Sequence, residues 1–291
     1  MSAARHVHHL SLSTEAAIER AATLIAGADS LLITAGAGMG VDSGLPDFRG
    51  HAGFWKAYPA LAAEGTSFTE IASPAAFRNN PRRAWGFYGH RLALYRDTTP
   101  HVGFAMLRKW GEAMRHGYFV FTSNVDGHFQ QAGFDPLRID ECHGTIHQLQ
   151  CLAPCSPDLW PAAGFDPALD AVRCELLGTM PVCPHCGGTA RPNILMFDDG
   201  DWVGEQRDVQ AQRCQAWLAQ VRRPLVIEIG AGLDIPTVRC FSNRVVLRHG
   251  GSLVRINPRE PKLDGIPGIG IGAEALPSLA AIDALLTDRR A

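Results

Sequence analysis

The segment LLITAGAGMG, residues 31–40, decides the fold of this chain. It begins with the apolar run LLIT (31–34) and passes into the glycine-rich turn GAGMG (36–40). A short apolar run that stops in glycines is typical of a buried strand. In parallel α/β sheets such a strand leads to the start of a helix, where free backbone amides bind phosphate groups. The segment therefore predicts a central strand followed by a phosphate-binding turn.

Similar apolar runs occur outward from this segment, at residues 118–122, 225–229 and 253–256, and each leads into a polar or glycine-rich turn. Helical patterns lie between the runs. Residues 14–26 place apolar side chains on one face, and residues 214–221 repeat the pattern. Strands that alternate with helices form mostly parallel sheets covered on both faces. We expect an α/β fold with a doubly wound, Rossmann-like parallel sheet.

Two segments interrupt this alternation. Residues 51–96 are aromatic-rich and predict a helical insertion, whereas residues 151–191 are rich in proline, glycine and cysteine and have little periodicity. We assign residues 151–191 to a small zinc-binding module for the reason given below. The remaining residues, 14–50, 97–150 and 192–291, form the predicted Rossmann-like domain.

Composition and charge bound the class of function. The chain has 291 residues, 46% hydrophobic and 19% charged, which is enough apolar material for a substantial core. Its 27 basic and 29 acidic side chains leave a formal net charge of -2, so bulk charge gives no reason to expect a specific nucleic-acid partner. No stretch is apolar for long enough to span a bilayer, and we expect a cytoplasmic protein with no membrane partner. Thiols stay reduced in that compartment, so the eight cysteines suit metal ligands or core residues.

Four of the cysteines form two close pairs, Cys151-x3-Cys155 and Cys183-x2-Cys186. Glycines and a proline beside the second pair supply tight turns that let backbone amides face thiolates. Four thiolates suit tetrahedral zinc with no position left for chemistry, so the pattern predicts one structural zinc ion. The alternative is a set of scattered buried thiols. Cys174 is a substitute ligand, because the first pair is spaced more widely than usual.

Polar side chains follow the ends of the predicted strands. Asn124 and Asp126 come after the strand at residues 118–122, and His143 stands in the later sequence ECHG. Doubly wound folds bind their ligands at the carboxyl ends of parallel strands. A histidine there, with a pKa near neutrality, suits a general base. The alternative for His143 is a strand-end histidine bonded to backbone, and spacing alone does not choose between the two.

Taken together, these motifs resemble the sirtuins (Sir2 family), the NAD-dependent protein lysine deacylases. The resemblance rests on GAG (36–38), SGLPDFRG (43–50), NVDG (124–127), His143-Gly144, the four cysteines and RPN (191–193), which occur in the family's order. It implies an enzyme that binds NAD as a co-substrate and transfers an acyl group from lysine to ADP-ribose. The implied products are nicotinamide, free lysine and O-acyl-ADP-ribose, and the implied partners are acyl-lysine proteins or peptides.

The resemblance also implies roles for single residues. His143 is the implied base, and Asn124 and Asp126 position the ribose and the nicotinamide amide. Residues 191–197 match the strand that pairs with a substrate peptide, which places Ile194 and Phe197 at the substrate. The implied cofactor-binding residues are Gly36, Ala37, Gly38, Asp47, Phe48, Arg49, Ser123, Asn124, Asp126, Gly230, Ala231, Gly232 and Asn257.

Tyr88 and Arg91 stand three residues apart, hence on one face if residues 84–95 form a helix. Arginine pairs bidentately with carboxylates. In the sirtuin branch that removes succinyl, malonyl or glutaryl groups, a Tyr-x-x-Arg pair at this place grips the acyl carboxylate, and the small Ala72 would leave room for a longer acyl chain. The alternative is an amphipathic helix whose tyrosine packs and whose arginine is solvated.

The chain departs from the usual family pattern near the cofactor. Gly40 and Gly232 stand where serine is usual, Ser123 where glutamine is usual, and Asp198-Asp199 in place of Gly-Glu. Two rival functions therefore stay open. One is a mono-ADP-ribosyltransferase or NAD glycohydrolase of the same fold, and the other is a non-catalytic NAD-binding module. Retention of His143 favours acyl transfer.

Overall fold

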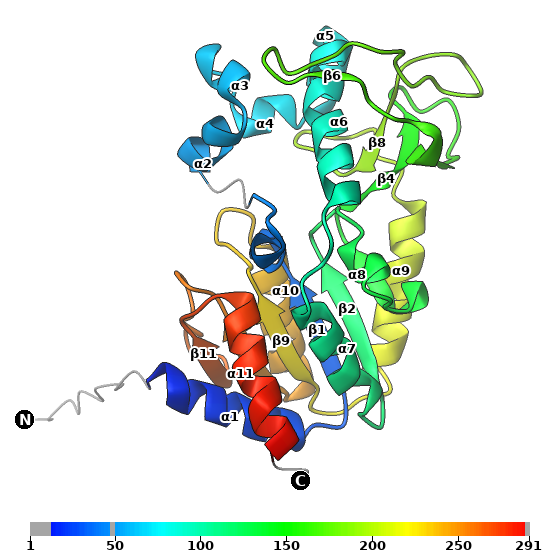
Figure 1. The fold of residues 1–291 in the computed structure, drawn as a ribbon. Helices are drawn as coiled ribbons and strands as arrows, with labels where there is room; N and C mark the ends of the chain where they lie inside the picture. The colour runs from blue at the N-terminus through cyan, green and yellow to red at the C-terminus, as the bar shows by residue number, and fades with distance from the viewer. Residues whose placement is uncertain (1–12, 47–49, 289–291) are drawn as a thin grey trace, which may run out of the picture.

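The computed structural model describes residues 13–46 and 50–288, and a six-stranded sheet lies at its centre (Figure 1). The strand order is β11-β10-β9-β1-β2-β3, and all neighbouring strands are parallel. The strands are β1 (Leu31–Ala35), β2 (Tyr118–Thr122), β3 (Ile139–Glu141), β9 (Leu225–Ile229), β10 (Ser252–Ile256) and β11 (Gly268–Ile271). The predicted doubly wound parallel sheet is confirmed, with the segment LLIT in a central strand.

Helices cover both faces of this sheet (Figure 1). The helices α1 (Thr14–Ala26), α7 (Gly103–Glu112) and α11 (Ala275–Asp288) cover one face, and α9 (Glu205–Leu218) and α10 (Thr237–His249) cover the other. Leu31 and Ile33 pack in the first of these cores, whereas Leu32 packs in the second. This alternation has the period of two that a strand imposes on its side chains.

The inserted segment before β2 is helical. Its helices are α2 (Gly50–Ala57), α3 (Pro59–Ala63), α4 (Phe68–Ile71), α5 (Pro74–Asn79) and α6 (Pro81–Asp97). The longest, α6, begins with Pro81 after the capping side chain of Asn80, which accepts a hydrogen bond from the Arg83 amide. The predicted helix over residues 84–95 lies within α6.

The cysteine-rich segment contains short antiparallel strands. A three-stranded sheet has the order β5 (Trp160–Pro161), β4 (Gly144–Cys151) and β8 (Ala190–Ile194), and a hairpin joins β6 (Leu169–Asp170) to β7 (Glu175–Leu176). The remaining short helices are η1 (Ala37–Ser43), α8 (His128–Gln131), η2 (Pro136–Arg138) and η3 (Ala162–Gly164). This segment and the helical insertion share a single aromatic-rich core. The boundaries predicted for them, 51–96 and 151–191, stay a prediction.

Candidate active site

A cleft of about 960 Å³ lies between the carboxyl edge of the sheet and the shared aromatic core. Its lower side is formed by the turns that follow β1, β2, β3 and β9, and its upper side by α4, α6 and the chain that follows β8. Parallel strands leave their polar turns at one edge, so residues far apart in sequence meet there. The volume is in the range of sites that enclose small molecules.

Two glycine turns form the floor of the cleft, and they pack directly on each other. The Gly38 amide donates to the Gly230 carbonyl oxygen at 3.1 Å, and the Gly36 amide donates to the Ile229 oxygen at 3.0 Å. A Cβ atom on Gly38 would lie 2.6 Å from the Gly230 Cα atom. Gly230 also has a φ of +63°, which favours glycine. These glycines are therefore required for backbone packing between the two turns, whatever binds above them.

Of the two turns, Gly36, Ala37, Gly230, Ala231 and Gly232 line the cleft. Gly38 does not line it and instead supports the second turn from below. The turn after β1 continues as the 3₁₀ helix η1.

The loop after β2 supplies the next polar groups. Ser123, Asn124 and Asp126 all line the cleft. The Asn124 side-chain amide donates to the Gly36 carbonyl oxygen at 3.0 Å, which joins this loop to the first glycine turn. One oxygen of Asp126 accepts the His128 amide at 2.9 Å, so that carboxylate is held in one orientation.

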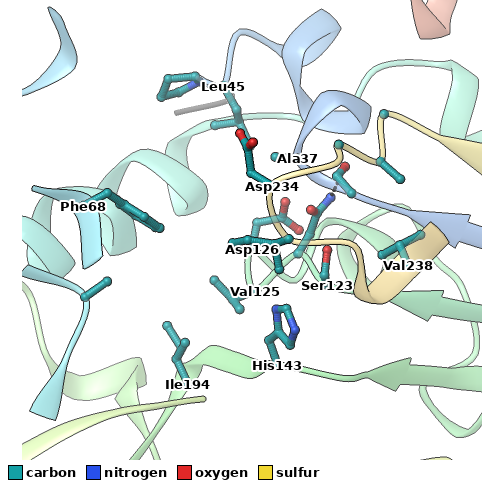
Figure 2. Close-up of a pocket in the computed structure, with 18 of the residues that line it drawn as sticks. Ala37, Leu45, Phe68, Ser123, Val125, Asp126, His143, Ile194, Asp234 and Val238 are labelled. Atoms are coloured by element: carbon teal, nitrogen blue, oxygen red, sulfur yellow. Dashed lines mark hydrogen bonds between the residues drawn. The ribbon is translucent and has the colours of Figure 1, made fainter. Parts of the chain in front are cut away.

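His143 lies between β3 and β4 and lines the cleft beside this loop. Figure 2 shows its ring pointing toward Ser123 and into the space below Asp126. The Leu195 amide donates to the His143 carbonyl oxygen at 2.9 Å, which fixes the backbone on the other side. Burial, and then the nearby positive charge of Arg207, lowers the pKa of His143. The imidazole is therefore neutral at neutral pH and able to accept a proton.

The upper wall contains the residues predicted to bind the acyl group. Tyr88, Arg91 and Ala72 line the cleft together with Tyr95. The Arg91 Nε donates to the Tyr95 hydroxyl at 2.9 Å, and the guanidinium carbon lies 5.6 Å from the centre of the Tyr88 ring. Burial raises the pKa of Tyr88 to about 12, so its hydroxyl keeps its proton and can donate. A cation and a hydroxyl donor thus face the same space.

The chain after β8 forms one edge of the cleft, where Ile194 and Phe197 line it. The Phe197 amide donates to the Ala72 carbonyl oxygen at 2.9 Å. Below this segment, Arg191 forms two hydrogen bonds with the Asp199 carboxylate, at 2.6 and 2.8 Å, and both side chains are fully buried. This paired charge fixes the segment that the sequence predicts to bind a peptide.

Other predicted residues lie elsewhere. Asp47, Phe48 and Arg49 fall outside the described residues. Asn257 is buried and does not line the cleft. Its side chain donates to the Ala231 oxygen at 2.9 Å and accepts the amides of Arg259 and Glu260 at 3.0 Å each. Asn257 therefore joins the loops after β9 and β10.

Several lining residues were not predicted. Tyr95 lies one helical turn beyond Arg91, so continuing the pattern of α6 would have found it. The other lining residues were not singled out as contacts, although Leu45, Pro46, Val125, Leu195 and Met196 lie within motifs that the sequence analysis used. These other lining residues are Leu45, Pro46, Ser67, Phe68, Thr69, Val125, Leu195, Met196, Leu233, Asp234, Ile235, Val238, Arg259 and Glu260.

The four predicted metal ligands come together outside the cleft. The sulfur atoms of Cys151, Cys155, Cys183 and Cys186 all lie within 4.8 Å of one another. The Cys151–Cys186 and Cys155–Cys183 distances are 3.7 and 3.6 Å. Sulfurs around a tetrahedral zinc ion, with bonds of about 2.3 Å, lie about 3.8 Å apart, so the cluster fits zinc. Cys174, the substitute ligand, lies outside it in the aromatic core.

Among the described helices, none has both the length and the apolar character needed to cross a membrane.

Comparison with known proteins identifies the family. The model of the Sir2 family matches residues 36–235. The chain is 32% identical over 266 residues to NAD-dependent protein deacylase 1 of Pseudomonas aeruginosa, covering 88% of this chain and 95% of that protein. It is 28% identical over 262 residues to the NAD-dependent protein deacylase of Thermococcus sibiricus, covering 89% and 92%.

Solved structures agree on the fold. A Sir2 homologue in complex with NAD superposes with a TM-score of 0.72 at 22% identity, covering 98% of each chain. A second Sir2 enzyme superposes with a TM-score of 0.70 at 23% identity, covering 95% of this chain and 100% of that one. With its sheet, its glycine turns and its four-cysteine cluster, this chain belongs to the Sir2 family.

Proposed function

We propose that this protein is an NAD-dependent protein lysine deacylase that gives nicotinamide and O-acyl-ADP-ribose. The observation that carries the proposal is that a single cleft brings two glycine turns together with the neutral imidazole of His143. The named relatives are NAD-dependent protein deacylases, which supports the same activity. A cleft of about 960 Å³ has room for a dinucleotide together with an acyl-lysine side chain.

The floor fits NAD because the residues present leave space where a phosphate needs it. Glycines and alanines at 36, 37, 230, 231 and 232 put no large side chain between the turn amides and the cleft. When bound, NAD would supply a ribose carbon whose bond to nicotinamide can break as the acyl oxygen of the substrate bonds to it, with nicotinamide as the leaving group. Asn124 and Asp126 would hold the ribose and nicotinamide end, since both line the cleft between the first glycine turn and His143.

His143 is the proposed general base. Its lowered pKa leaves the ring unprotonated, so it can take a proton from a ribose hydroxyl as the acyl group moves to that sugar. The reaction requires that bulk water be kept from the reacting sugar. Without that exclusion, water would compete with the acyl oxygen. Asp47, Phe48 and Arg49 stay predicted contributors to this end of the cleft.

The acyl group is proposed to carry a carboxylate, as in succinyl-lysine or malonyl-lysine, with acetyl-lysine as a second substrate. Arg91 and Tyr88 together offer a buried cation and a hydroxyl donor, which is the set that a carboxylate prefers. Ala72 faces the same space with only a methyl group, so a longer acyl chain fits. The peptide around the acyl-lysine would pair with the segment from Ile194 to Phe197 through backbone hydrogen bonds.

The four cysteines are proposed to hold one structural zinc ion, away from the chemistry. Acylated proteins are the proposed partners. The cytoplasmic location and the lack of a nucleic-acid partner stay predictions from the sequence.

The test compares two peptides that differ only in carrying acetyl-lysine or succinyl-lysine, each incubated with NAD and followed by mass spectrometry of the peptide and of O-acyl-ADP-ribose. We expect both to be deacylated, with succinyl-lysine preferred. The variant Arg91→Met should lose about 10-fold to 100-fold in kcat/KM for succinyl-lysine only, as expected for one charged hydrogen-bonding partner.

The control is Arg78→Met, because Arg78 is half exposed on α5 and pairs with Asp201 at the surface. Acetyl preference unaffected by Arg91→Met would reject the carboxylate pocket and leave a deacetylase. Nicotinamide release without any deacylation would reject the proposed function in favour of ADP-ribosyl transfer or NAD hydrolysis.

A further inference from the structure

The helix α6 has two opposite faces with different neighbours. One face places Tyr88, Arg91 and Tyr95 in the cleft. The other packs against the cysteine-rich segment and contains two glycines, Gly86 and Gly89, both buried. Glycine is unfavourable inside a helix, so two of them on one face need a structural reason.

The reason is the close approach of the β6–β7 hairpin. A Cβ atom on Gly86 would lie 2.0 Å from the Cys174 carbonyl oxygen and 2.6 Å from the Glu175 amide nitrogen. A Cβ atom on Gly89 would lie 2.9 Å from the Pro167 Cβ atom and 3.1 Å from the Leu169 side chain. The hairpin therefore sits in a notch on the helix that only glycine permits.

Polar contacts hold the helix to the same segment along its whole length. At its start, Arg82 donates to the Leu176 oxygen at 2.8 Å, and at its end Arg96 donates to the Phe165 and Ala162 oxygens, each at 2.8 Å. Between them, the Trp85 indole donates to the Ala190 oxygen at 2.9 Å. The position of α6 is thus set from the side away from the cleft.

The hairpin belongs to the loop that the four cysteines close. It lies between Cys155 and Cys183, one member of each cysteine pair. A metal ion bound by both pairs would restrict the conformations of this loop. It would thereby also fix the surface of the hairpin against which α6 packs.

We infer that Gly86 and Gly89 are positioning residues for acyl selectivity: by seating the hairpin against α6, they set where Tyr88 and Arg91 stand in the cleft. The inference rests on the proposed function. Gly86 lies two residues before Tyr88 and Gly89 two residues before Arg91, so a helix displaced at the notch moves the acyl-binding side chains directly. The two glycine turns follow β1 and β9 of the central sheet and His143 follows β3, so we expect a change at the notch to move them less than it moves the α6 side chains.

The size of the expected displacement follows from the contact distances. Ordinary contact with a Cβ atom begins at 3.4 Å, whereas the Gly86 notch leaves 2.0 Å against backbone. The helix or the hairpin must therefore move by about 1 Å or more. A displacement of this size lowers the reaction rate on the order of 100-fold when it misplaces a binding group. Gly89 meets only side-chain atoms, so its substitution should have the smaller effect.

The experiment measures kcat and KM for the succinyl-lysine and acetyl-lysine peptides at saturating NAD, in wild type, Gly86→Ala and Gly89→Ala. We expect KM for the succinyl peptide to rise at least about 10-fold in Gly86→Ala and less in Gly89→Ala, with kcat for the acetyl peptide within about 2-fold of wild type. The matched control is Gly178→Ala in the same segment, whose added Cβ would meet only the Ala168 Cβ, at 3.7 Å.

A second measurement separates this inference from the proposed function and from misfolding. Hydrogen exchange of the α6 amides should quicken in Gly86→Ala and Gly89→Ala but not in Gly178→Ala, at a zinc content equal to wild type. If wild type shows no Arg91-dependent succinyl preference, the acyl assignment fails while the exchange result still tests the support of α6. Three results would each overturn the inference: an equal loss of kcat/KM for the succinyl and acetyl peptides, unchanged kcat and KM for both peptides, or unchanged hydrogen exchange of the α6 amides.

Discussion

The two sides of the cleft are built by different means. The floor, defined by the glycine turns after β1 and β9 with the β2 loop and His143, is held mainly by backbone hydrogen bonds between neighbouring turns. The upper wall, defined by Ala72 with Tyr88, Arg91 and Tyr95 of α6, is held by side chains and by the segment behind it. Few single side-chain substitutions can alter a floor built from backbone turns, whereas the side-chain wall can change its acyl preference by single substitutions.

The cores beneath the two sides differ in the same way. The core under the sheet is mainly aliphatic, as regular strands and helices allow. The core behind the upper wall is aromatic, and its rings include two edge-on pairs, Phe54 with Phe87 and Phe77 with Trp85. Large rings fill the irregular space between short helices and short strands, where aliphatic side chains would leave gaps. The predictions below test whether the two sides are separable.

The largest effect should follow loss of the metal site, which disrupts the segment that supports the upper wall. In Cys183→Ser we expect zinc to be lost and deacylation to become undetectable, because a structural zinc site contributes on the order of 10 kcal/mol to the segment it organises. Metal analysis and hydrogen exchange check this, and β1 and β2 should keep their protection while β4 and β8 lose theirs. Cys240→Ser, at an exposed cysteine outside the cluster, is the control. Full zinc content and activity in Cys183→Ser would contradict the assignment.

Next in size is removal of the proposed base from the floor. His143→Ala should lower deacylation by about 10²-fold to 10⁴-fold, the usual contribution of a general base. NAD binding, measured by titration, should change little, because backbone hydrogen bonds hold the two glycine turns together. His249→Ala, at the far end of α10, is the control. A variant that retains deacylation at the wild-type rate would exclude His143 from the chemistry.

A smaller loss of activity should follow when a substitution adds a single methyl group between the two glycine turns. In Gly230→Ala the new Cβ would lie 2.4 Å from backbone atoms of Gly38, at a φ of +63°. We expect kcat/KM for NAD to fall about 100-fold as the turns separate. The control is Gly265→Ala, which has a φ of +88° but nothing within 4 Å, so it carries the backbone strain without the contact. Equal effects in the two variants would show that strain, not packing, explains the glycine.

The smallest expected effect is a shift in pH dependence. The positive charge of Arg207 helps to lower the pKa of His143, so Arg207→Gln should raise that pKa toward its ordinary value. His143 must be unprotonated to act, so the acid limb of kcat/KM should move to higher pH, by less than about 1 unit. The exposed Arg213→Gln on the same helix is the control. A shift to lower pH, or none, would contradict the assigned role of the charge.

The sequence by itself determined those features that depend on near neighbours in the chain. The strand before the first glycine turn, the helix that carries Tyr88 and Arg91, and the two close cysteine pairs all have patterns within a few residues. Periodicity and spacing report local geometry, so these were predicted. The Sir2 motifs are also local, and the family model matches residues 36–235, the stretch that contains them.

Only the tertiary structure decided which of these local elements touch. Gly38 packs against Gly230, although the two glycines are far apart in the sequence. In the same way, Gly86 leaves room for the distant backbone of Cys174. Asn257, predicted from the sequence as a cofactor contact, joins the loops after β9 and β10 in the fold, and its contact with NAD stays a prediction. Cys174 resembles a ligand in spacing but lies in the aromatic core. Such contacts depend on how distant segments pack, and a repeat of two or 3.6 residues contains no information on that.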